Sequence, residues 1–538
     1  MRGMMMDYPI TLQQFLERNQ RLFGKKQVAS RAANGIHRYT YEEYGQRVGR
    51  LANALRALGV QQGERVATFA WNTYRHLEFY YAVPCMGAVL HTVNIRLSPE
   101  QIVYIINDAG DKILAVDSEL LPVVQNLRGH LTTVEQIIVM QDEPHLSDDY
   151  LDYEALLAAA SPEIAWPRID ENSAAAICYS SGTTGNPKGV VYSHRAIYLH
   201  TMSVTAADSL GLSEADRVMP VVPMFHANAW GLPHGAVAAG STQVLPGPQP
   251  TPVDLLTLIQ NERVTITAGV PTVWIGVMAE IQKTGGYDLS SLRCIACGGS
   301  APPQRLIEAY EQSTGVPILH AWGMTETTPI ATICRLKSTL QGISDEERLG
   351  VMAKQGLPVL GMDVTVMDEQ GTEVAWDGET FGEIVVRGPW VTAGYLHVDT
   401  PERFTDGWFR TGDVATIDPE GYVHIVDRTK DLVKSGGEWI SSVDLEGKIM
   451  GHADVLEAAV IAVPDAQWGE RPLALVVPRP GAELTPDAVL EYLRPLVAKF
   501  ELPDEVMFID EVPKTSVGKF DKKVLRERFA ARAPLSRS

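Results

Sequence analysis

The sequence predicts a large α/β part followed by a smaller α+β part. Helical and strand-like segments alternate through the first half of the 538 residues, which is the pattern of parallel sheets covered by helices. After residue 361 the strand-like segments become short and are separated by turn-forming segments, which indicates antiparallel strands. The C-terminal part then combines strands with a single helix, an order typical of α+β domains.

The first elements are assigned from periodicity and capping signals. Residues Tyr41–Leu58 carry leucines at helical spacing and predict a helix. Arg65–Trp71 is an apolar run that predicts a buried strand. Ser98 and Gln101 form a capping-box pattern that opens a second helix, and residues 113–117 predict the strand that follows it. This order predicts a parallel sheet covered by helices.

The second half predicts a β-rich region and then a small separate domain. We expect antiparallel strands at residues 364–368, 383–388 and 422–427. For the small domain we expect strands at 455–464, 472–478 and 506–510, and a helix at 487–500. The charged segment Val426–Trp439 is the expected boundary, because its two adjacent glycines permit backbone conformations closed to other residues. An ordinary surface turn explains these glycines, Gly436 and Gly437, equally well.

Composition excludes several classes of protein. Hydrophobic residues make up 45% and charged residues 21%, as in soluble globular proteins, so a disordered chain is excluded. The formal charge of −20 repels phosphate backbones, which excludes nucleic acid as the main partner but leaves room for a local basic pocket. We expect no signal peptide, spanning helix or lipidation. Five sparse cysteines favour a reducing cytoplasm without disulfides.

The loop Tyr179–Gly189, YSSGTTGNPKG, is the most informative segment. Glycines let backbone amides converge on an anion, hydroxyl groups add donors and a lysine adds charge, so the loop predicts a binding site for nucleotide phosphates. It is not a Walker A loop, because G-x-x-x-x-G-K-[ST] does not fit. The serine-elbow and dinucleotide-binding motifs are absent as well. Cys294 and Cys297 form a single C-x-x-C, which favours two core thiols over a zinc site.

Five motifs occur in order along the chain. They are YSSGTTGNPKG (179–189), WGMTET (322–327), YLHVDTPERFTDGWFRTGD (395–413), DRTKDLVKSGGEWI (427–440) and PKTSVGKFDKK (513–523). Together they resemble the acyl-adenylate-forming superfamily, which includes acyl-CoA synthetases, nonribosomal adenylation domains and firefly luciferase. Within it, Val222–Trp230 and Ser435–Glu446 most resemble bacterial medium- and long-chain fatty-acyl-CoA synthetases. That branch also includes 3-methylmercaptopropionate CoA ligases.

The resemblance implies a domain organisation and a reaction. Residues 1–426 would form a large domain of helix-covered sheets with a small β-barrel-like subdomain at about 355–426. A hinge at 427–434 would join it to a small mobile C-terminal domain, 435–538. A carboxylate would attack the α-phosphorus of MgATP to give acyl-AMP and pyrophosphate, and the thiol of coenzyme A would then displace AMP. We therefore expect a cytoplasmic, homodimeric ligase that uses ATP, Mg²⁺, CoA and a fatty or related carboxylic acid.

The resemblance also assigns residues to a nucleotide site. Glu326 is the expected Mg²⁺ ligand, with Ser180 near the metal. Thr325 is expected to donate to the α-phosphate, and Asp413 to accept hydrogen bonds from both ribose hydroxyls. Trp322 stands where relatives commonly have tyrosine, and either ring can stack on adenine. The other expected nucleotide-binding residues are Ser181, Gly182, Thr183, Thr184, Gly185, Lys188, Gly299, Ser300, Ala301, His320, Ala321, Gly323, Arg428 and Lys434.

Lys519 is the expected catalytic residue of adenylation. Its ammonium group is a compact charge on a long stem that can reach both the acyl carboxylate and the α-phosphate. Lys430 is the expected hinge residue, and Glu438 and Trp439 follow as linker contacts. Lys514 is a weaker candidate than Lys519, and Lys522 and Lys523 are interpreted as solvated charges.

The acyl side of the site is expected at Val222–Trp230. The resemblance makes Trp230 a gate to an acyl tunnel, with His226, Ala227 and Gly231 beside it; a core tryptophan beside a histidine is the alternative. A hydrocarbon chain gains about 0.8 kcal/mol per buried methylene, which suits a medium- or long-chain acid. A ligase for a short or unusual acid, such as methylmercaptopropionate or an aryl acid, remains a second interpretation. A non-catalytic relative that binds an acyl group or a nucleotide is the third.

Overall fold

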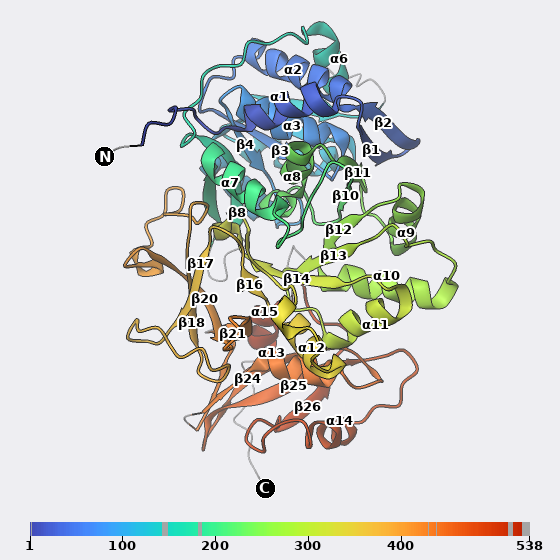
Figure 1. The fold of residues 1–538 in the computed structure, drawn as a ribbon, viewed down its shortest axis with the longest axis vertical. Coiled ribbons are helices and arrows are strands. Elements are labelled where there is room, and N and C mark those ends of the chain that lie inside the picture. The colour runs from blue at the N-terminus through green and yellow to red at the C-terminus, as the bar shows by residue number, and fades with distance from the viewer. Residues whose placement is uncertain are drawn as a thin grey trace.

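The computed structural model describes residues 1, 3–142, 149–180, 186–428, 430–436, 438–514 and 520–529. The N-terminal elements lie at one end of the long axis and the C-terminal elements at the other (Figure 1). Two expected site segments, the loop residues 181–185 and Lys519, lie outside the described residues. Within the described part, no helix is long and apolar enough to cross a membrane.

The first sheet has seven strands, of which all but one neighbouring pair are parallel. The exception is the antiparallel pair β8–β9, which carries the ends of the predicted phosphate-binding loop. Because both faces are covered, β4 is buried along its whole length, and β3 and β5 over most of theirs. In order across the sheet, the strands are β7 (Leu151–Asp152), β6 (Gln136–Met140), β5 (Asp111–Asp117), β3 (Arg65–Phe69), β4 (Val89–Thr92), β8 (Ala174–Ser180) and β9 (Lys188–Ser193).

The second sheet has nine strands, parallel in the middle and antiparallel at both edges. The predicted strand that contains Cys294 and Cys297 is its member β13, and both thiols are buried and free. In order across the sheet, the strands are β16 (Leu357–Pro358), β15 (Ile330–Ile333), β14 (Ile318–Gly323), β13 (Cys294–Gly298), β12 (Ile266–Gly269), β10 (Arg217–Pro220), β11 (Thr242–Leu245), β1 (Gln27–Ala32) and β2 (Gly35–Thr40).

Helices join the two sheets through one continuous hydrophobic core. Every residue of α3 is buried, which marks it as a central helix, and α1 packs on α2, α3, α7 and α8 (Figure 1). The helices of the large part are α1 (Leu12–Phe23), α2 (Tyr41–Ala57), α3 (Tyr74–Cys85), α4 (Pro99–Ala109), α5 (Leu121–Leu127), α6 (Tyr153–Ala159), α7 (His194–Thr205), α8 (Leu232–Ala239), α9 (Pro252–Asn261), α10 (Pro271–Thr284), α11 (Gln304–Thr314) and α12 (Asp345–Ala353).

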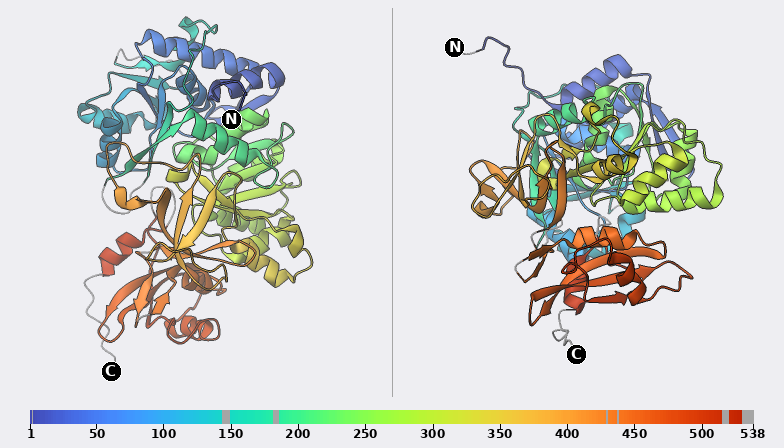
Figure 2. Two further views of the ribbon diagram at one scale, coloured as in Figure 1. Left: turned by 60° about the vertical axis from the view of Figure 1, so that its left-hand side comes forward. Right: turned by 60° about the horizontal axis from the view of Figure 1, so that its bottom comes forward.

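A third sheet of five antiparallel strands lies beside the two large sheets (Figure 2). It includes the antiparallel strands expected after residue 361, and its inward-facing valines and isoleucines join the same core. The strands are β17 (Asp363–Met367), β18 (Gly382–Arg387), β19 (Phe404–Thr405), β20 (Trp408–Ile417) and β21 (Val423–Arg428).

The C-terminal part is an α+β unit with its own two hydrophobic clusters. It is the orange-to-red part at the bottom of Figure 1, and α13 packs both on its own β24 and on β21 of the large part. Its elements are β22 (Val433–Ser435), β23 (Glu438–Ile440), α13 (Ser442–Met450), β24 (Val455–Asp465), β25 (Gly469–Pro478), α14 (Pro486–Leu493), β26 (Glu505–Phe508) and α15 (Lys522–Phe529).

Most of the predicted elements are confirmed, and two predictions are wrong. The capping box at Ser98 is present, and α2 ends one residue before its predicted end. The helix expected at 487–500 ends instead at Leu493, because Pro495 has no N–H to donate and disfavours helical backbone at the residue before it. Lys522 is not solvated: its side chain is 9% exposed, and its ammonium group lies 2.7 Å from the carboxylate of Glu446.

Candidate active site

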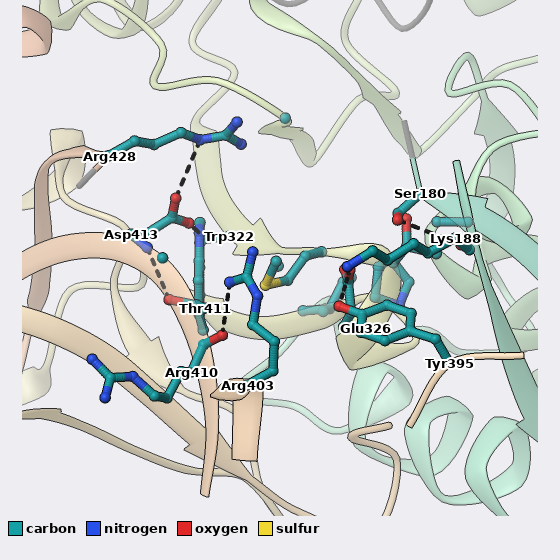
Figure 3. A pocket seen from close by; sticks show the side chains of 18 of the residues that line it. Ser180, Lys188, Trp322, Glu326, Tyr395, Arg403, Arg410, Thr411, Asp413 and Arg428 are labelled. Carbon is teal, nitrogen blue, oxygen red and sulfur yellow. Dashed lines mark hydrogen bonds and ion pairs between the residues drawn. The ribbon is translucent and has the colours of Figure 1, made fainter. Parts of the chain in front are cut away.

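A cavity of about 650 Å³ lies where the three sheets of the large part meet, beside Arg428 and Lys430 of the expected hinge (Figure 3). The carboxyl ends of the parallel strands β13 and β14 open into it, the usual place for a ligand site in an α/β sheet. The sequence-predicted residues that line it are Ser180, Lys188, His226, Ala227, Trp230, Gly299, Ala321, Trp322, Gly323, Thr325, Glu326, Asp413, Arg428 and Lys430.

Glycines at these strand ends are required by close backbone packing. A Cβ atom on Gly298 would lie 2.3 Å from the carbonyl oxygen of Ala321, and one on Gly323 would lie 1.8 Å from that of Pro329. A larger residue at Gly298 would push β13 and β14 apart, and one at Gly323 would displace the backbone of Pro329. The glycines therefore permit close backbone packing beside the cavity.

One end of the cavity is organised around the buried carboxylate of Asp413. Its Oδ2 accepts a hydrogen bond of 3.0 Å from the indole N–H of Trp322, and its Oδ1 lies 3.3 Å from Arg428 Nε. Asp413 and Arg428 face each other because they are paired across β20 and β21. The side chain of Arg428 is 40% exposed, so this ion pair alone adds only about 0–1 kcal/mol. The arrangement presents an oriented acidic acceptor beside an aromatic ring.

The other end contains Glu326, in a buried turn over Thr325–Thr327. Its Oε1 accepts a hydrogen bond of 2.8 Å from the hydroxyl of Tyr395, and its carbonyl oxygen accepts one of 2.8 Å from the N–H of Thr392. The ammonium group of Lys188 lies 5.1 Å from the centre of the Tyr395 ring. Burial, followed by the charge of Glu326, raises the pKa of Tyr395, so its hydroxyl remains a donor.

Ten described residues of the lining were missed by the sequence predictions (24 − 14), and Tyr395, Arg403 and Arg410 are among those that lie in the quoted motif 395–413. Tyr395 orients Glu326, and Arg403 lies between the Asp413 and Glu326 ends in Figure 3. Arg410 also lines the cavity, where it pairs with Glu383. The signal was two arginines and a tyrosine inside a motif already assigned to the site. With Lys188, Arg428 and Lys430, these arginines place five basic side chains around the cavity, against the four acidic ones of Glu326, Glu383, Glu402 and Asp413.

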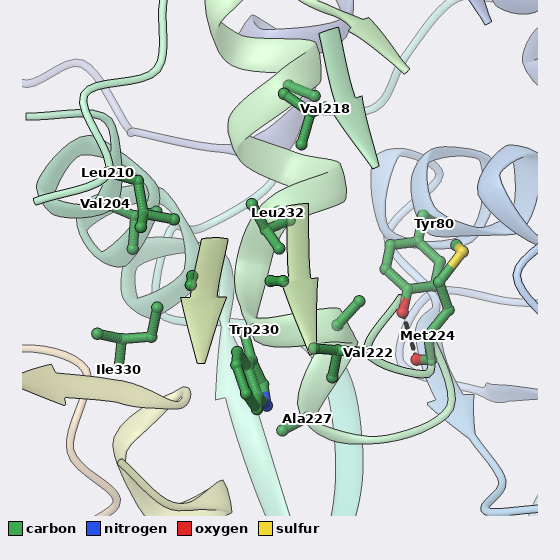
Figure 4. Packing of buried hydrophobic residues seen from close by; sticks show 14 of the residues in the cluster. Tyr80, Val204, Leu210, Val218, Val222, Met224, Ala227, Trp230, Leu232 and Ile330 are labelled. Atoms are coloured by element: carbon green, nitrogen blue, oxygen red, sulfur yellow. Dashed lines mark hydrogen bonds between the residues drawn. The ribbon is translucent and has the colours of Figure 1, made fainter. Parts of the chain in front are cut away.

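The third side of the cavity is apolar and is formed by Trp230. Its side chain is 7% exposed and lies against the backbone at Gly298, where an added Cβ would be 3.3 Å from the indole. His226 and Ala227 precede it along the cavity wall. Figure 4 shows Trp230 in the same cluster of buried hydrophobic residues as Val222, Leu232 and Ile330, so Trp230 belongs both to the cavity lining and to the hydrophobic core.

Several predicted site residues do not line this cavity. The ring of His320 is buried, its Nδ1 lies 2.9 Å from the carbonyl oxygen of Ala353, and burial lowers its pKa to about 4, as in a core histidine. Lys434 points its ammonium group at the ring of Trp439, 4.2 Å away. Ser300, Ala301, Gly231 and Trp439 also lie outside the lining. Ser181, Gly182, Thr183, Thr184, Gly185 and Lys519 lie outside the described residues.

Comparison with known proteins decides the family. The AMP-binding enzyme family matches residues 16–396, and the AMP-binding enzyme C-terminal domain matches residues 444–519. The chain belongs to the AMP-binding enzyme family. This confirms the resemblance to acyl-adenylate-forming enzymes that the five motifs carried.

Relatives of this AMP-binding enzyme match over nearly its whole length. A long-chain-fatty-acid–CoA ligase of Thermus thermophilus is 50% identical over 98% of this chain and 96% of its own. A 3-methylmercaptopropionyl-CoA ligase of Ruegeria lacuscaerulensis is 41% identical over 98% of this chain and 99% of its own. The crystal structure of the anthranilate CoA ligase AuaEII in complex with anthranoyl-AMP is 27% identical, with a TM-score of 0.87 over 98% of this chain and 99% of its own. The last match confirms the predicted fold class.

Proposed function

We propose that this AMP-binding enzyme is a fatty-acid–CoA ligase that favours medium- or long-chain acids. It would form acyl-AMP and pyrophosphate from a carboxylate and MgATP, and then acyl-CoA and AMP from the thiol of CoA. The enzyme class, an AMP-forming acid–CoA ligase, is confirmed by the named relatives. The observation that carries the choice of acid is the cavity itself, which has a polar, charged nucleotide side and an apolar side formed by Trp230.

The polar side fits ATP. Asp413 offers two carboxylate oxygens to the ribose hydroxyls, and Trp322 offers an indole face to adenine while its N–H keeps Asp413 in place. Lys188 and the arginines supply positive charge for the phosphates, and residues 181–185 would add backbone donors. These groups hold and align the α-phosphorus for attack by the carboxylate.

The donor set also fits one Mg²⁺ ion held largely by the substrate. Within the described residues no group of three acidic, histidine or cysteine side chains could hold a metal by itself. Mg²⁺ is commonly bound by one or two carboxylates together with substrate phosphates, and Glu326 with the hydroxyl of Ser180 provides such a partial site. When bound, the ion would neutralise the charge that builds up on the phosphates.

The small domain would supply Lys519 for adenylation and then rotate to admit CoA. We assign residues 1–426 to the large domain, including a β-rich subdomain at about 355–426, residues 427–434 to the hinge and residues 435–538 to the small mobile domain. Lys430 is the proposed pivot, with Lys434, Glu438 and Trp439 in the linker that faces the nucleotide when the domains close. Lys430 already lines the cavity, which supports this role.

The acid would enter beside Trp230, with His226, Ala227 and Gly231 around it. Because a carboxylate needs no deprotonation at neutral pH, His226 would act as a lining residue. A ligase for 3-methylmercaptopropionate is the second candidate, which the Ruegeria relative supports. A non-catalytic relative is disfavoured by the intact set of Glu326, Asp413, Arg428 and Lys519. We further propose a cytoplasmic homodimer.

The test is a pyrophosphate-release assay over straight-chain acids from acetate to stearate, 3-methylmercaptopropionate and anthranilate, each with and without CoA. We expect the highest kcat/KM with a medium- or long-chain acid, MgATP dependence, and acyl-CoA only when CoA is present. A maximum at 3-methylmercaptopropionate or at an aryl acid would replace the fatty acid as substrate. Release with no acid in the panel would contradict the proposal.

A further inference from the structure

The turn that carries Trp230 has a left-handed backbone. The φ angles of Ala227, Asn228, Ala229 and Trp230 are 43°, 50°, 49° and 57°, and Gly231 follows at 75°. L residues avoid this region because Cβ approaches the next carbonyl oxygen, and those that enter it do so as single residues. Four consecutive non-glycine residues in this conformation therefore need support from their surroundings.

The turn is short of internal support. Within it the N–H of Ala229 donates to the carbonyl of His226 at 3.0 Å, and the N–H of Leu232 donates to the carbonyl of Ala229. All five residues from Ala227 to Gly231 are buried, so water cannot satisfy their polar groups. A strained segment of this kind persists only when neighbouring elements hold it.

Asn228 connects the turn to two strands of the seven-stranded sheet. Its Oδ1 accepts from the hydroxyl of Thr92 at the end of β4, 3.5 Å away, and from the thiol of Cys178 on β8, 3.4 Å away. Burial raises the pKa of Cys178 to about 11, so the thiol keeps the proton that it donates. Asparagine also tolerates the left-handed region better than most residues. Its side chain is therefore suited to this position in two ways.

The Cys178 thiol is also connected, through Tyr192, to the nucleotide side of the cavity. Tyr192 on β9 lies beside the Cys178 thiol and donates from its hydroxyl to the carbonyl of Thr325 at 2.7 Å. Thr325 precedes Glu326 in the turn that faces the phosphates. The contacts of Asn228 thus tie the turn of Trp230 to the strand pair β8–β9, which also supports the nucleotide end.

We propose that Asn228 is a positioning residue: through Thr92 and Cys178 it holds the left-handed turn and so fixes Trp230 at the apolar side of the cavity, where it sets entry of the acid. The effect on the acid rests on the proposed function, whereas the effect on the position of Trp230 does not. Asn228 would contact no reacting atom and would act only through the position of Trp230.

The kinetic test compares three variants with a matched control. Asn228→Gly removes the anchor but accepts the left-handed backbone, and Asn228→Ala removes the anchor and disfavours that backbone. Thr92→Val with Cys178→Ala leaves Asn228 in place and removes both donors, together with the contacts that the Cys178 sulfur makes with Tyr192 and with the backbone of Ala227 and Asn228. Gln249→Gly is the control, because Gln249 also has a left-handed backbone (φ 40°) but is exposed.

We expect Asn228→Gly and the double variant to raise KM for a medium-chain acid about tenfold, equivalent to about 1.4 kcal/mol, and Asn228→Ala to raise it more. In the two Asn228 variants KM for ATP should stay within about twofold, and the control should match the wild type. A lower melting temperature with an unchanged ratio of the two KM values would leave Asn228 a purely structural role and overturn the proposal. Equal rises in both KM values would overturn it as well.

The second readout does not depend on activity. The protein is labelled with 5-fluorotryptophan, and Trp230→Phe identifies the ¹⁹F resonance of Trp230. That resonance should shift or split in Asn228→Gly and in the double variant but not in Gln249→Gly. An unmoved resonance would refute the proposal whatever the kinetics. If the wild-type enzyme activates no fatty acid, the proposed function fails, and the resonance alone decides whether Asn228 positions Trp230.

Discussion

Replacing Tyr395 with phenylalanine should loosen Glu326 without disturbing the fold. The change removes one hydroxyl, whose hydrogen bond to Glu326 Oε1 is 2.8 Å long. The backbone of the same turn keeps its two other supports, from the N–H of Thr392 and from the hydroxyl of Tyr192. The phenyl ring also keeps its contact with the Lys188 ammonium group. Only the orientation of the Glu326 carboxylate should therefore change.

The expected size of the effect follows from the kind of bond that is lost. Hydrogen bonds to charged groups contribute about 1.5–3 kcal/mol, which corresponds to roughly 10- to 150-fold in an equilibrium constant. Loss of a residue that orients a metal ligand typically costs about 10- to 100-fold in metal affinity or activity. We expect the Mg²⁺ concentration at half-maximal adenylation to rise by about tenfold or more in Tyr395→Phe.

The measurement is a Mg²⁺ titration of pyrophosphate release at saturating ATP and acid, together with a melting temperature. Glu326→Gln should show a weaker Mg²⁺ dependence and lower turnover in the same assay. Tyr422→Phe is the control, because its hydroxyl donates to the carbonyl of Arg335 at 2.8 Å outside the cavity, and it should change stability alone. An unchanged titration in Tyr395→Phe would refute the view that its hydroxyl supports a metal ligand.

Three further predictions concern the small domain and acid stability. Lys519→Ala should lower acyl-adenylate formation by orders of magnitude but leave thioester formation from supplied acyl-adenylate largely intact; equal losses in the two half-reactions would contradict its role. Lys430→Pro fixes φ near −65° and should reduce thioester formation far more than adenylation, whereas proportional losses would exclude it as the pivot. Burial lowers the pKa of His320 to about 4, so the unfolded chain binds the extra proton below its ordinary pKa of about 6.5. The contribution of His320 to stability should therefore be full above about pH 6.5 and fall by about 1.4 kcal/mol per pH unit towards pH 4; urea unfolding of His320→Gln should show a decline that is shallower by this amount.

The fold was largely predictable because its signals are local. The capping box at Ser98, the leucine spacing of α2 and the apolar run of β3 each depend on a few neighbouring residues. The end of α14 could also have been predicted from the sequence, because Pro495 stands two residues beyond it. The order of the strands in the sheets could not be predicted from the sequence, because it depends on contacts between residues far apart in the chain. Lys522 illustrates the same limit: its partner Glu446 lies 76 residues earlier (522 − 446).

Candidate site residues that lie in sequence motifs could be predicted. Contacts that depend on the folded geometry were harder to predict. Glu326, Asp413 and Arg428 were assigned from motifs, and the structure brings all three to one cavity. The hydrogen bond from Trp322 to Asp413 could not be read from sequence, because 91 residues separate the partners. The left-handed turn at 227–231 has no sequence signal either, since alanine and tryptophan rarely adopt that backbone.

The contacts around the linker show what a rotation of the small domain would have to change. Arg428 is paired with Asp413 of the large domain, whereas Asp431 is paired with Arg526 of the small domain. The backbone between these two anchors contains Lys430, which makes it the shortest segment able to absorb a rotation. Hydrogen bonds outside this segment also join the two parts: Asp427 Oδ2 accepts from the backbone N–H of Ser442 at 2.6 Å and from its hydroxyl at 2.5 Å, and the hydroxyl of Ser441 donates to the carbonyl of Val426. Rotation would separate Asp427 from Ser442, so these bonds would stabilise the present orientation against the second one.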